Sequence, residues 1–143
     1  MSVRQISIFL ENKKGRLAEV TRLLAIRGVN IRALSLADTA DFGVLRIIVN
    51  DPDACLETLK AGGIIAQVTD VLAVEIEDAP GGLSRVLAVL DEAGLNVEYM
   101  YAYVEKMKAN AIVICKIDDK ETASRVLKEK GIGTLSAATL REL

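Results

Sequence analysis

The most constraining feature of this sequence is an internal repeat. Residues 11–31, ENKKGRLAEVTRLLAIRGVNI, return 66 positions later as residues 77–97, EDAPGGLSRVLAVLDEAGLNV, with seven of 21 positions identical. The identical pairs are Glu11 and Glu77, Gly15 and Gly81, Leu17 and Leu83, Val20 and Val86, Leu24 and Leu90, Gly28 and Gly94, and Asn30 and Asn96. Because two such copies fill a chain of 143 residues, the sequence predicts two domains, 1–69 and 70–143.

The hydrophobic pattern of the first copy switches between the two periods of regular secondary structure. Segments with the apolar character of strands are 5–10, 31–37, 42–49 and 64–70. From Leu17 onward, apolar residues recur at helical spacing until Gly28, which ends the predicted helix. Asp51 followed by Pro52 predicts the start of a second helix. The predicted order is therefore β-α-β-β-α-β.

The second copy repeats this order. Its predicted strands are 71–76, 96–105, 111–117 and 133–140, and its predicted helices are 82–93 and a segment capped by Asp119 that runs through Lys130. Two successive β-α-β-β-α-β units indicate an α+β fold made of two ferredoxin-like sandwiches in tandem. Each would have a four-stranded antiparallel sheet with both helices on one face.

The repeated loop between the first strand and the first helix is suited to hold a small zwitterion. A glycine there lets the backbone approach a guest, and the helix start behind it offers unpaired amides to a carboxylate. Asn or Asp before the glycine suits an ammonium group, Asn after the helix adds a donor and an acceptor, and Leu gives an apolar wall. The candidate ligand-binding residues are Asn12, Gly15, Arg16, Leu17, Asn30, Asp78, Gly81, Gly82, Leu83 and Asn96. The same residue types also suit ordinary turns and tight packing, so this chemistry alone leaves both interpretations open.

The patterns N-x-x-G-R-L … G-V-N-I and D-x-P-G-G-L … G-L-N-V resemble the ACT domain, twice over nearly the whole chain. The resemblance implies a regulatory module that binds an amino acid at interfaces between domains, with the first loop and the start of the second strand lining the site. It carries over to Asn12, Gly15, Leu17 and Asn30, and to their counterparts in the second copy. Lys14 stands where the family usually has proline. With no catalytic domain attached, the resemblance implies a stand-alone tandem ACT protein that signals to a metabolic enzyme or regulator.

Composition excludes several other classes of function. The net charge is −2 and there are only five aromatic residues, which argues against nucleic-acid binding. No apolar run approaches the roughly 20 residues needed to span a bilayer, and MSVRQISIFL lacks the features of a signal peptide, so we expect a cytoplasmic protein. Histidine is absent, and Cys55 and Cys115 lie apart in apolar surroundings, which indicates buried thiols. We therefore expect no enzyme activity, no metal and no cofactor.

The short connection between the copies constrains assembly. The segments 64–70 and 71–76 adjoin, so at most about two residues, reaching about 7 Å, would link the domains. Pairing of the two second strands within one chain would need a span of over 20 Å, at roughly 4.8 Å per strand. The sequence therefore predicts that second strands pair between two chains in a homodimer, with sites at the seams. Exchange of the last strands between copies is the alternative arrangement.

Two other functions remain open at this stage. One is a ligand-free dimerising adaptor that regulates a metabolic enzyme by contact. The other, more remote, is an acyl-phosphate hydrolase, because such enzymes share the ferredoxin-like fold and use an arginine in the first loop with an asparagine on the second strand. Arg16 and Asn30 resemble that pair loosely, whereas the second copy has Gly82 in place of the arginine.

Overall fold

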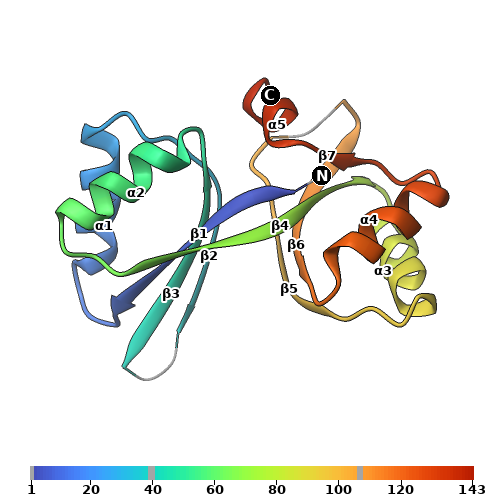
Figure 1. The fold of residues 1–143 in the computed structure, drawn as a ribbon, viewed down its shortest axis with the longest axis horizontal. Coiled ribbons are helices and arrows are strands. Elements are labelled where there is room, and N and C mark those ends of the chain that lie inside the picture. The colour runs from blue at the N-terminus through green and yellow to red at the C-terminus, as the bar shows by residue number, and fades with distance from the viewer. Residues whose placement is uncertain (1, 39–40, 106–107) are drawn as a thin grey trace. The chain divides into compact units, whose positions relative to one another are not determined.

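The computed structural model describes residues 2–38, 41–105 and 108–143 (Figure 1). The chain divides into two compact units, one formed by Arg4–Thr69 and the other by Asp70–Leu143 together with Ser2 and Val3. We call Arg4–Thr69 the first repeat and Asp70–Leu143 the second repeat. Each repeat has its own hydrophobic core.

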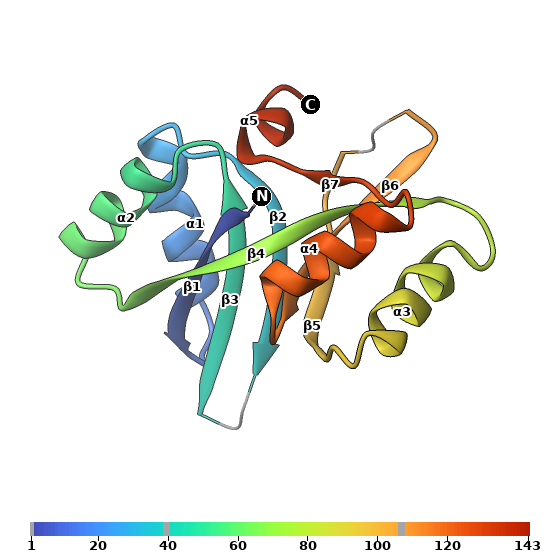
Figure 2. The same cartoon turned by 45° about the vertical axis from the view of Figure 1, so that its right-hand side comes forward.

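The first repeat is a four-stranded antiparallel sheet with two helices on one face (Figures 1 and 2). Its elements are β1 (Val3–Glu11), α1 (Arg16–Ile26), β2 (Ile31–Asp38), β3 (Phe42–Val49), α2 (Pro52–Ala61) and the start of β4 (Ala66–Glu77). The strand order is β2-β3-β1-β4, which leaves β2 at an edge. In the register, Leu45 of β3 lies opposite both Ile8 and Leu36. Ile8 and Leu24 are fully buried between sheet and helices, because alternate residues of β1 and every third or fourth residue of α1 face inward.

The second repeat has the same core arrangement with an altered C-terminal end. Its elements are the rest of β4, α3 (Gly82–Glu92), β5 (Val97–Ala102), β6 (Asn110–Ile117), α4 (Lys120–Glu129), β7 (Thr134–Leu135) and α5 (Ala137–Arg141). β4 lies between β6 and β7, β5 pairs with β6, and all these pairings are antiparallel. The predicted α+β class and the tandem of ferredoxin-like units are confirmed.

Two predicted strands are in fact one. Most of the segments 64–70 and 71–76 forms the single strand β4, so the predicted linker between them does not exist. The two compact units still divide between Thr69 and Asp70, inside this strand. The physical reason is visible in the residues: Ala66–Glu77 contains neither glycine nor proline, the two strongest breakers of regular structure. A twelve-residue strand therefore contributes to both repeats.

The last predicted strand, 133–140, is also wrong. Only Thr134 and Leu135 pair with β4, and the chain then turns into the short helix α5. The cause is a helix cap, because the Ser136 hydroxyl accepts a hydrogen bond from the backbone amide of Thr139 at 3.1 Å. Leu140 on this helix is buried, and its carbonyl accepts a hydrogen bond from the Tyr103 hydroxyl at 3.3 Å. The strand predicted over 96–105 is likewise shorter, and residues 106–107 just after it lie outside the described part of the chain.

The remaining local predictions hold. Asp51 and Asp119 cap α2 and α4, each accepting a hydrogen bond from a backbone amide three residues on, at 3.1 Å. Cys55 and Cys115 are buried thiols in the two cores. Among the helices of residues 2–38, 41–105 and 108–143, none is long and apolar enough to cross a membrane.

Candidate functional site

The repeated loop starts α1 and α3 in the same unusual way. Gly15 and Gly81 are the N-cap residues, with left-handed φ angles of 90° and 87°, and neither helix receives a side-chain cap. By contrast, α2, α4 and α5 are capped by Asp51, Asp119 and Ser136. The first amides of a helix have no acceptor within the helix, and its N-terminus attracts negative charge. The Arg16 and Gly82 amides donate to the Lys13 and Ala79 carbonyls, so the following amides of each first turn are the ones suited to a carboxylate.

The N-cap glycines of these loops are required by the local backbone conformation. A Cβ atom added at Gly15 or Gly81 would meet nothing within 4 Å, so the glycine is needed for its positive φ, a conformation in which a side chain is strained. The close backbone approach occurs one residue later in the second repeat, where a Cβ on Gly82 would overlap the carbonyl oxygen of Glu77. The space beside both N-cap glycines is open.

A cavity of about 200 Å³ lies beside the loop of the first repeat, and we call it the first-repeat cavity. It is lined by Leu10, Glu11, Asn12, Lys13, Leu17, Leu36, Asp38 and Gly43. Asn12 donates a hydrogen bond from Nδ2 to Oδ2 of Asp38 at 3.4 Å, which ties the loop to the end of β2. The leucines from β1, α1 and β2 give it apolar walls beside this polar pair. Of the predicted residues, Asn12 and Leu17 line this cavity.

Arg16, the third predicted residue of this loop, is directed elsewhere. Its Nη1 atom pairs with the Glu19 carboxylate at 3.0 Å on the same helix, and Arg16 does not line the first-repeat cavity. Asn30 follows α1, whose 11 residues span about 16 Å. Arg16 and Asn30 therefore lie at opposite ends of α1 and do not form the pair that an acyl-phosphate hydrolase would need.

The second repeat has a larger cavity, of about 530 Å³, which we call the second-repeat cavity. It is lined by Glu75, Ile76, Glu77, Pro80, Gly81, Gly82, Arg85, Val86, Asn110, Gly131, Ile132 and Gly133. Gly81 and Gly82 are predicted site residues that it includes. Asp78 and Leu83 are outside its lining, and Leu83 is 39% exposed. The cavities of the two repeats thus lie on different sides of equivalent loops.

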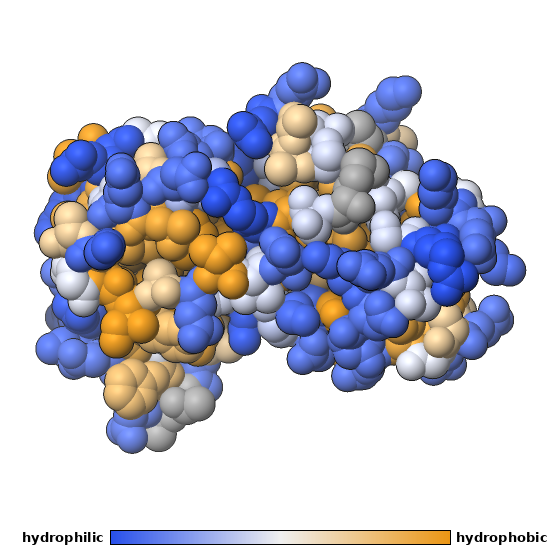
Figure 3. Space-filling model, viewed as in Figure 1, coloured by the Kyte–Doolittle hydropathy of each residue, from blue (hydrophilic) through white to orange (hydrophobic). Residues whose placement is uncertain are grey.

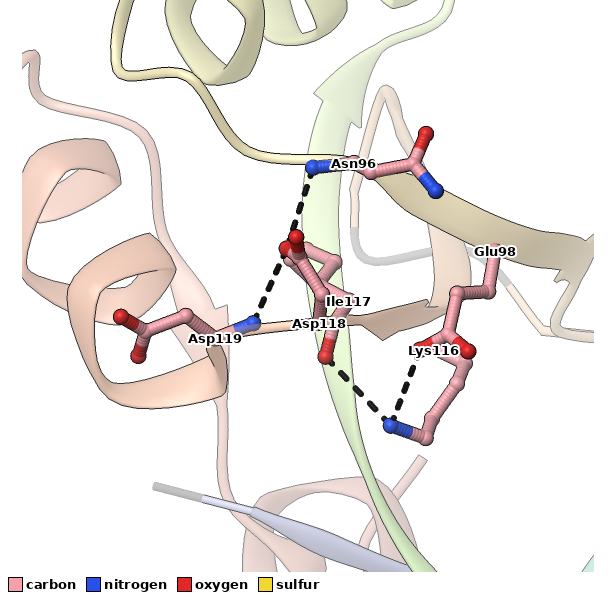
Figure 4. Close-up of polar contacts among 6 residues, drawn as sticks. All are labelled: Asn96, Glu98, Lys116, Ile117, Asp118 and Asp119. Atoms are coloured by element: carbon pink, nitrogen blue, oxygen red, sulfur yellow. Dashed lines mark hydrogen bonds and ion pairs between the residues drawn. The ribbon is translucent and has the colours of Figure 1, made fainter.

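Asn30 and Asn96 occupy equivalent places at the far end of each repeat. Their backbone amides donate to the side chains of Asn50 at 2.8 Å and Asp118 at 3.0 Å. Figure 4 shows that the Asn96 carboxamide points away from Asp118, and Asn30 is exposed at the corresponding position. In the first repeat, therefore, Gly15 and Asn30 lie at opposite ends of α1. Gly81 and Asn96 lie at opposite ends of α3 in the same way.

Sequence reasoning missed the residues that other strands and turns bring to these cavities. Leu36, Asp38 and Gly43 reach the first-repeat cavity because β2 ends and β3 begins beside the loop. Arg85 and Asn110 reach the second-repeat cavity from α3 and β6. Arg85 follows Gly81 by four residues, which is about one helical turn. Helical spacing could therefore have predicted that Arg85 lies near the loop.

The fold and its cavities define the class of tandem ferredoxin-like α+β proteins, and comparison with known proteins gives the family. A family model described as an ACT domain pair matches residues 1–143, and the chain belongs to this family. The predicted resemblance to tandem ACT domains is thereby confirmed.

Solved structures share the fold of this chain. The chain is similar to protein BT0572 from Bacteroides thetaiotaomicron, with 41% identity, a TM-score of 0.93 and coverage of 100% of this chain and 98% of that one. The ligand-free regulatory subunit of aspartate kinase from Thermus thermophilus shares the fold, with a TM-score of 0.62, 18% identity and coverage of 88% and 90%.

One curated relative also matches. It is the acetolactate synthase small subunit of Buchnera aphidicola subsp. Baizongia pistaciae (strain Bp), 35% identical over 79 residues, which are 54% of this chain. The match spans about half the length of that relative.

Proposed function

We propose that this protein is a non-catalytic regulator that binds an amino acid with an apolar side chain in the first-repeat cavity. The observation that supports this most is the combination of an uncapped α1 terminus, a polar Asn12–Asp38 pair and leucine walls around about 200 Å³. A ligand carboxylate would meet the first-turn amides of α1 that follow Arg16, and the ammonium would meet Asp38. Leu17 and Leu36 would contact the side chain. Each part of a free amino acid thus has a complementary group.

We further propose that the site is completed by a second chain. Leu34 and Leu36 on the edge strand β2 are 51% and 52% exposed, and an exposed apolar edge strand is a template for pairing. Antiparallel pairing of two β2 strands about a two-fold axis at Leu34 places residue 30 of one chain opposite residue 38 of the other. Asn30 would then approach the partner's loop at Asn12, which α1 prevents within one chain. This arrangement gives the predicted homodimer with sites at its seams.

The regulated partner would be a metabolic enzyme in the cytoplasm. This proposal draws on the curated relative, which is the small subunit of an enzyme, and on the family, an ACT domain pair. Binding of an amino acid would change the equilibrium between states of the dimer, and the enzyme would respond to that change.

A thermal-shift panel of the twenty common amino acids tests the ligand proposal. A ligand at about 100 times its dissociation constant adds roughly 2.7 kcal/mol to the free energy of unfolding. For a protein of this size the melting temperature rises by several degrees. The Leu17→Ala variant removes one apolar wall and should reduce the shift given by apolar amino acids. No shift with any amino acid contradicts the proposal.

A ligand-free adaptor is the second candidate, and one observation favours it. Eight of the ten exposed large apolar side chains among the described residues belong to the first repeat: Phe9, Leu17, Ile26, Leu34, Leu36, Phe42, Ile65 and Val68. On the face seen in Figure 3, apolar side chains gather over this repeat. Such a surface suits protein contacts. An enzyme complex recovered in equal amount with and without every amino acid would support the adaptor.

A further inference from the structure

The second-repeat cavity has a different wall from the equivalent place in the first repeat. The Glu75 amide donates to the Gly133 carbonyl at 2.9 Å, and the Phe9 amide donates to the Ile65 carbonyl at 3.0 Å in the same way. These bonds show that Glu75 is structurally equivalent to Phe9, and Gly133 to Ile65. The second repeat thus has the carboxylate of Glu75 in place of the Phe9 ring. It has Gly133, which lacks a side chain, in place of Ile65.

The strand register identifies a third replaced position. Glu77 pairs with Asn110 across β4 and β6, as Glu11 pairs with Phe42 across β1 and β3. Asn110 therefore stands where the first repeat has an aromatic ring. The wall of the second-repeat cavity has gained a hydrogen-bonding side chain at this position.

The helix beside the cavity differs as well. In the first repeat, Arg16 and Glu19 form an ion pair at 3.0 Å on α1. Sixty-six residues later these positions are Gly82 and Arg85, so the carboxylate partner is missing and a guanidinium stands where an acid stood. Among the residues that the structure describes, no carboxylate pairs with Arg85. Its Nη2 atom donates to the Lys130 carbonyl at 3.0 Å, which holds the side chain at the cavity wall.

The cavity lining also carries a negative charge held in place by a hydrogen bond. Asn110 donates from Nδ2 to Oε1 of Glu75 at 2.7 Å, and both side chains are partly buried. This leaves Oε2 of Glu75 on the side of Gly133, where an added Cβ would lie 3.2 Å from it. The lining therefore offers a partly buried carboxylate and an exposed guanidinium, each with one hydrogen bond to the protein, to one space of about 530 Å³.

We propose that the second-repeat cavity is a separate binding site for a small amino acid with a polar side chain. Arg85 binds the ligand carboxylate, and Glu75 binds its ammonium group. With Glu77 also in the lining, two carboxylates face one guanidinium, which favours an uncharged or basic side chain over an acidic one. The polar second-repeat cavity and the leucine-walled first-repeat cavity would select different ligands. One chain would therefore bind two different amino acids. This inference does not depend on the ligand proposed for the first repeat.

Isothermal titration of the full chain with L-serine, L-glutamine, L-lysine and L-glutamate tests this site. We expect at least one of the first three to bind and L-glutamate to bind more weakly. Arg85→Gln removes one charge-assisted contact and should weaken binding by about 10-fold or more. Gly133→Ile introduces the residue of the first repeat, fills the cavity near Glu75 and should abolish binding. Circular dichroism and the melting temperature establish that both variants are folded.

The matched control is Leu17→Ala, which changes the first-repeat cavity and should leave the binding of polar amino acids unaltered. The backbone amides of Gly81, Gly131 and Gly133 give a second readout, because their NMR signals should shift on titration with the ligand that binds. Absence of binding by serine, glutamine and lysine overturns the proposal. The proposal is also overturned if Arg85→Gln and Gly133→Ile both bind these amino acids as tightly as the parent protein. Loss of leucine binding in Leu17→Ala, with polar binding intact, separates this site from that of the first repeat.

Discussion

Gly82 lies directly against the carbonyl oxygen of Glu77, so that a Cβ atom at residue 82 would overlap this oxygen. The loop before α3 is therefore folded more tightly than its counterpart before α1, which carries Arg16 at the same position. The turn bonds agree, because the Gly82 amide donates to Ala79 at 3.0 Å and the Arg16 amide to Lys13 at 3.4 Å. The close contact at Gly82 is thus one difference between two copies of the loop that have equal lengths.

Replacing Gly82 by alanine should therefore lower the free energy of unfolding by about 1–3 kcal/mol, the usual cost of forcing an atom into a packed site. Urea unfolding followed by circular dichroism measures this change. Gly62→Ala is the matched control, because its φ is −84° and its Cβ would make ordinary contacts of 3.5–3.6 Å. Equal losses of stability in the two variants would contradict the role assigned to Gly82.

Helix starts and ends were predicted correctly where they depend on interactions between residues close in sequence. Asp51 and Asp119 marked helix starts because a carboxylate cap acts within three residues. Gly28 marked a helix end and has a φ of 72°, which glycine adopts without strain. Caps and helix ends depend on neighbours in sequence, and a single sequence contains that information.

The wrong predictions came from competition between local and long-range interactions. Apolar residues in 133–140 fit a strand, but the Ser136 cap and the burial of Leu140 stabilise a helix there. The break expected at residue 70 came from the idea of two separate copies, whereas pairing with other strands keeps β4 continuous. The cavities were missed in part for the same reason: Asp38 and Asn110 reach them only through strand register.

Helix α5, which replaces the predicted strand, offers a direct test of that correction. Leu140 is 2% exposed, so Leu140→Ala should lower the free energy of unfolding by about 2–5 kcal/mol through lost burial and a cavity. Leu143 is only partly buried, and Leu143→Ala is the control with an expected smaller loss. Chemical denaturation measures both. A Leu140 variant as stable as the parent would show that this segment is not packed.

Protonation of Asp119 should destabilise the protein in acid. Hydrogen bonds from Thr122 lower the pKa of Asp119 below its ordinary value. A lowered folded-state pKa means that the stabilisation is present above the unfolded-state pKa, about 3.9, and is lost as the pH falls through the folded-state value. The melting temperatures of the parent and Asp119→Ala should therefore differ most near neutral pH and converge in acid. A constant difference down to pH 2 would contradict this linkage.

The two cysteines should be unreactive in the folded protein. Burial raises the pKa of the Cys55 thiol to about 11, assisted by Asp51, and burial raises the pKa of Cys115 to about 12. The reactive species is the thiolate, so a thiol reagent at pH 8 should label neither residue until the chain unfolds. Addition of denaturant should release two reactive thiols. Rapid labelling of the native protein would show that a core is open.

The raised pKa values of Cys55 and Cys115 also predict how the stability of the protein changes in alkali. Because the folded-state pKa values lie above the unfolded-state value of about 8.5, the thiols contribute stability that is present below pH 8.5 and is lost as the pH rises towards 11 or 12. Replacing both Cys55 and Cys115 by alanine should remove this component of the alkaline decline in melting temperature. A parent and variant that decline in parallel from pH 8 to 10 would contradict it.

The separation of Asn12 from Asn30 by α1 makes dimerisation and ligand binding inseparable in the proposed site. Leu34→Lys places a charge at the centre of the β2 edge and should produce a monomer, since an edge lysine opposes strand pairing. If the partner's Asn30 completes the site, the monomer should also bind apolar amino acids at least 10-fold more weakly. Ile65→Lys is the matched control, because Ile65 is 71% exposed in the same repeat but lies away from β2. Analytical ultracentrifugation and isothermal titration measure the two effects. A monomeric Leu34→Lys variant with unaltered binding would show that each chain holds a complete site, and Asn30 would then be a turn residue.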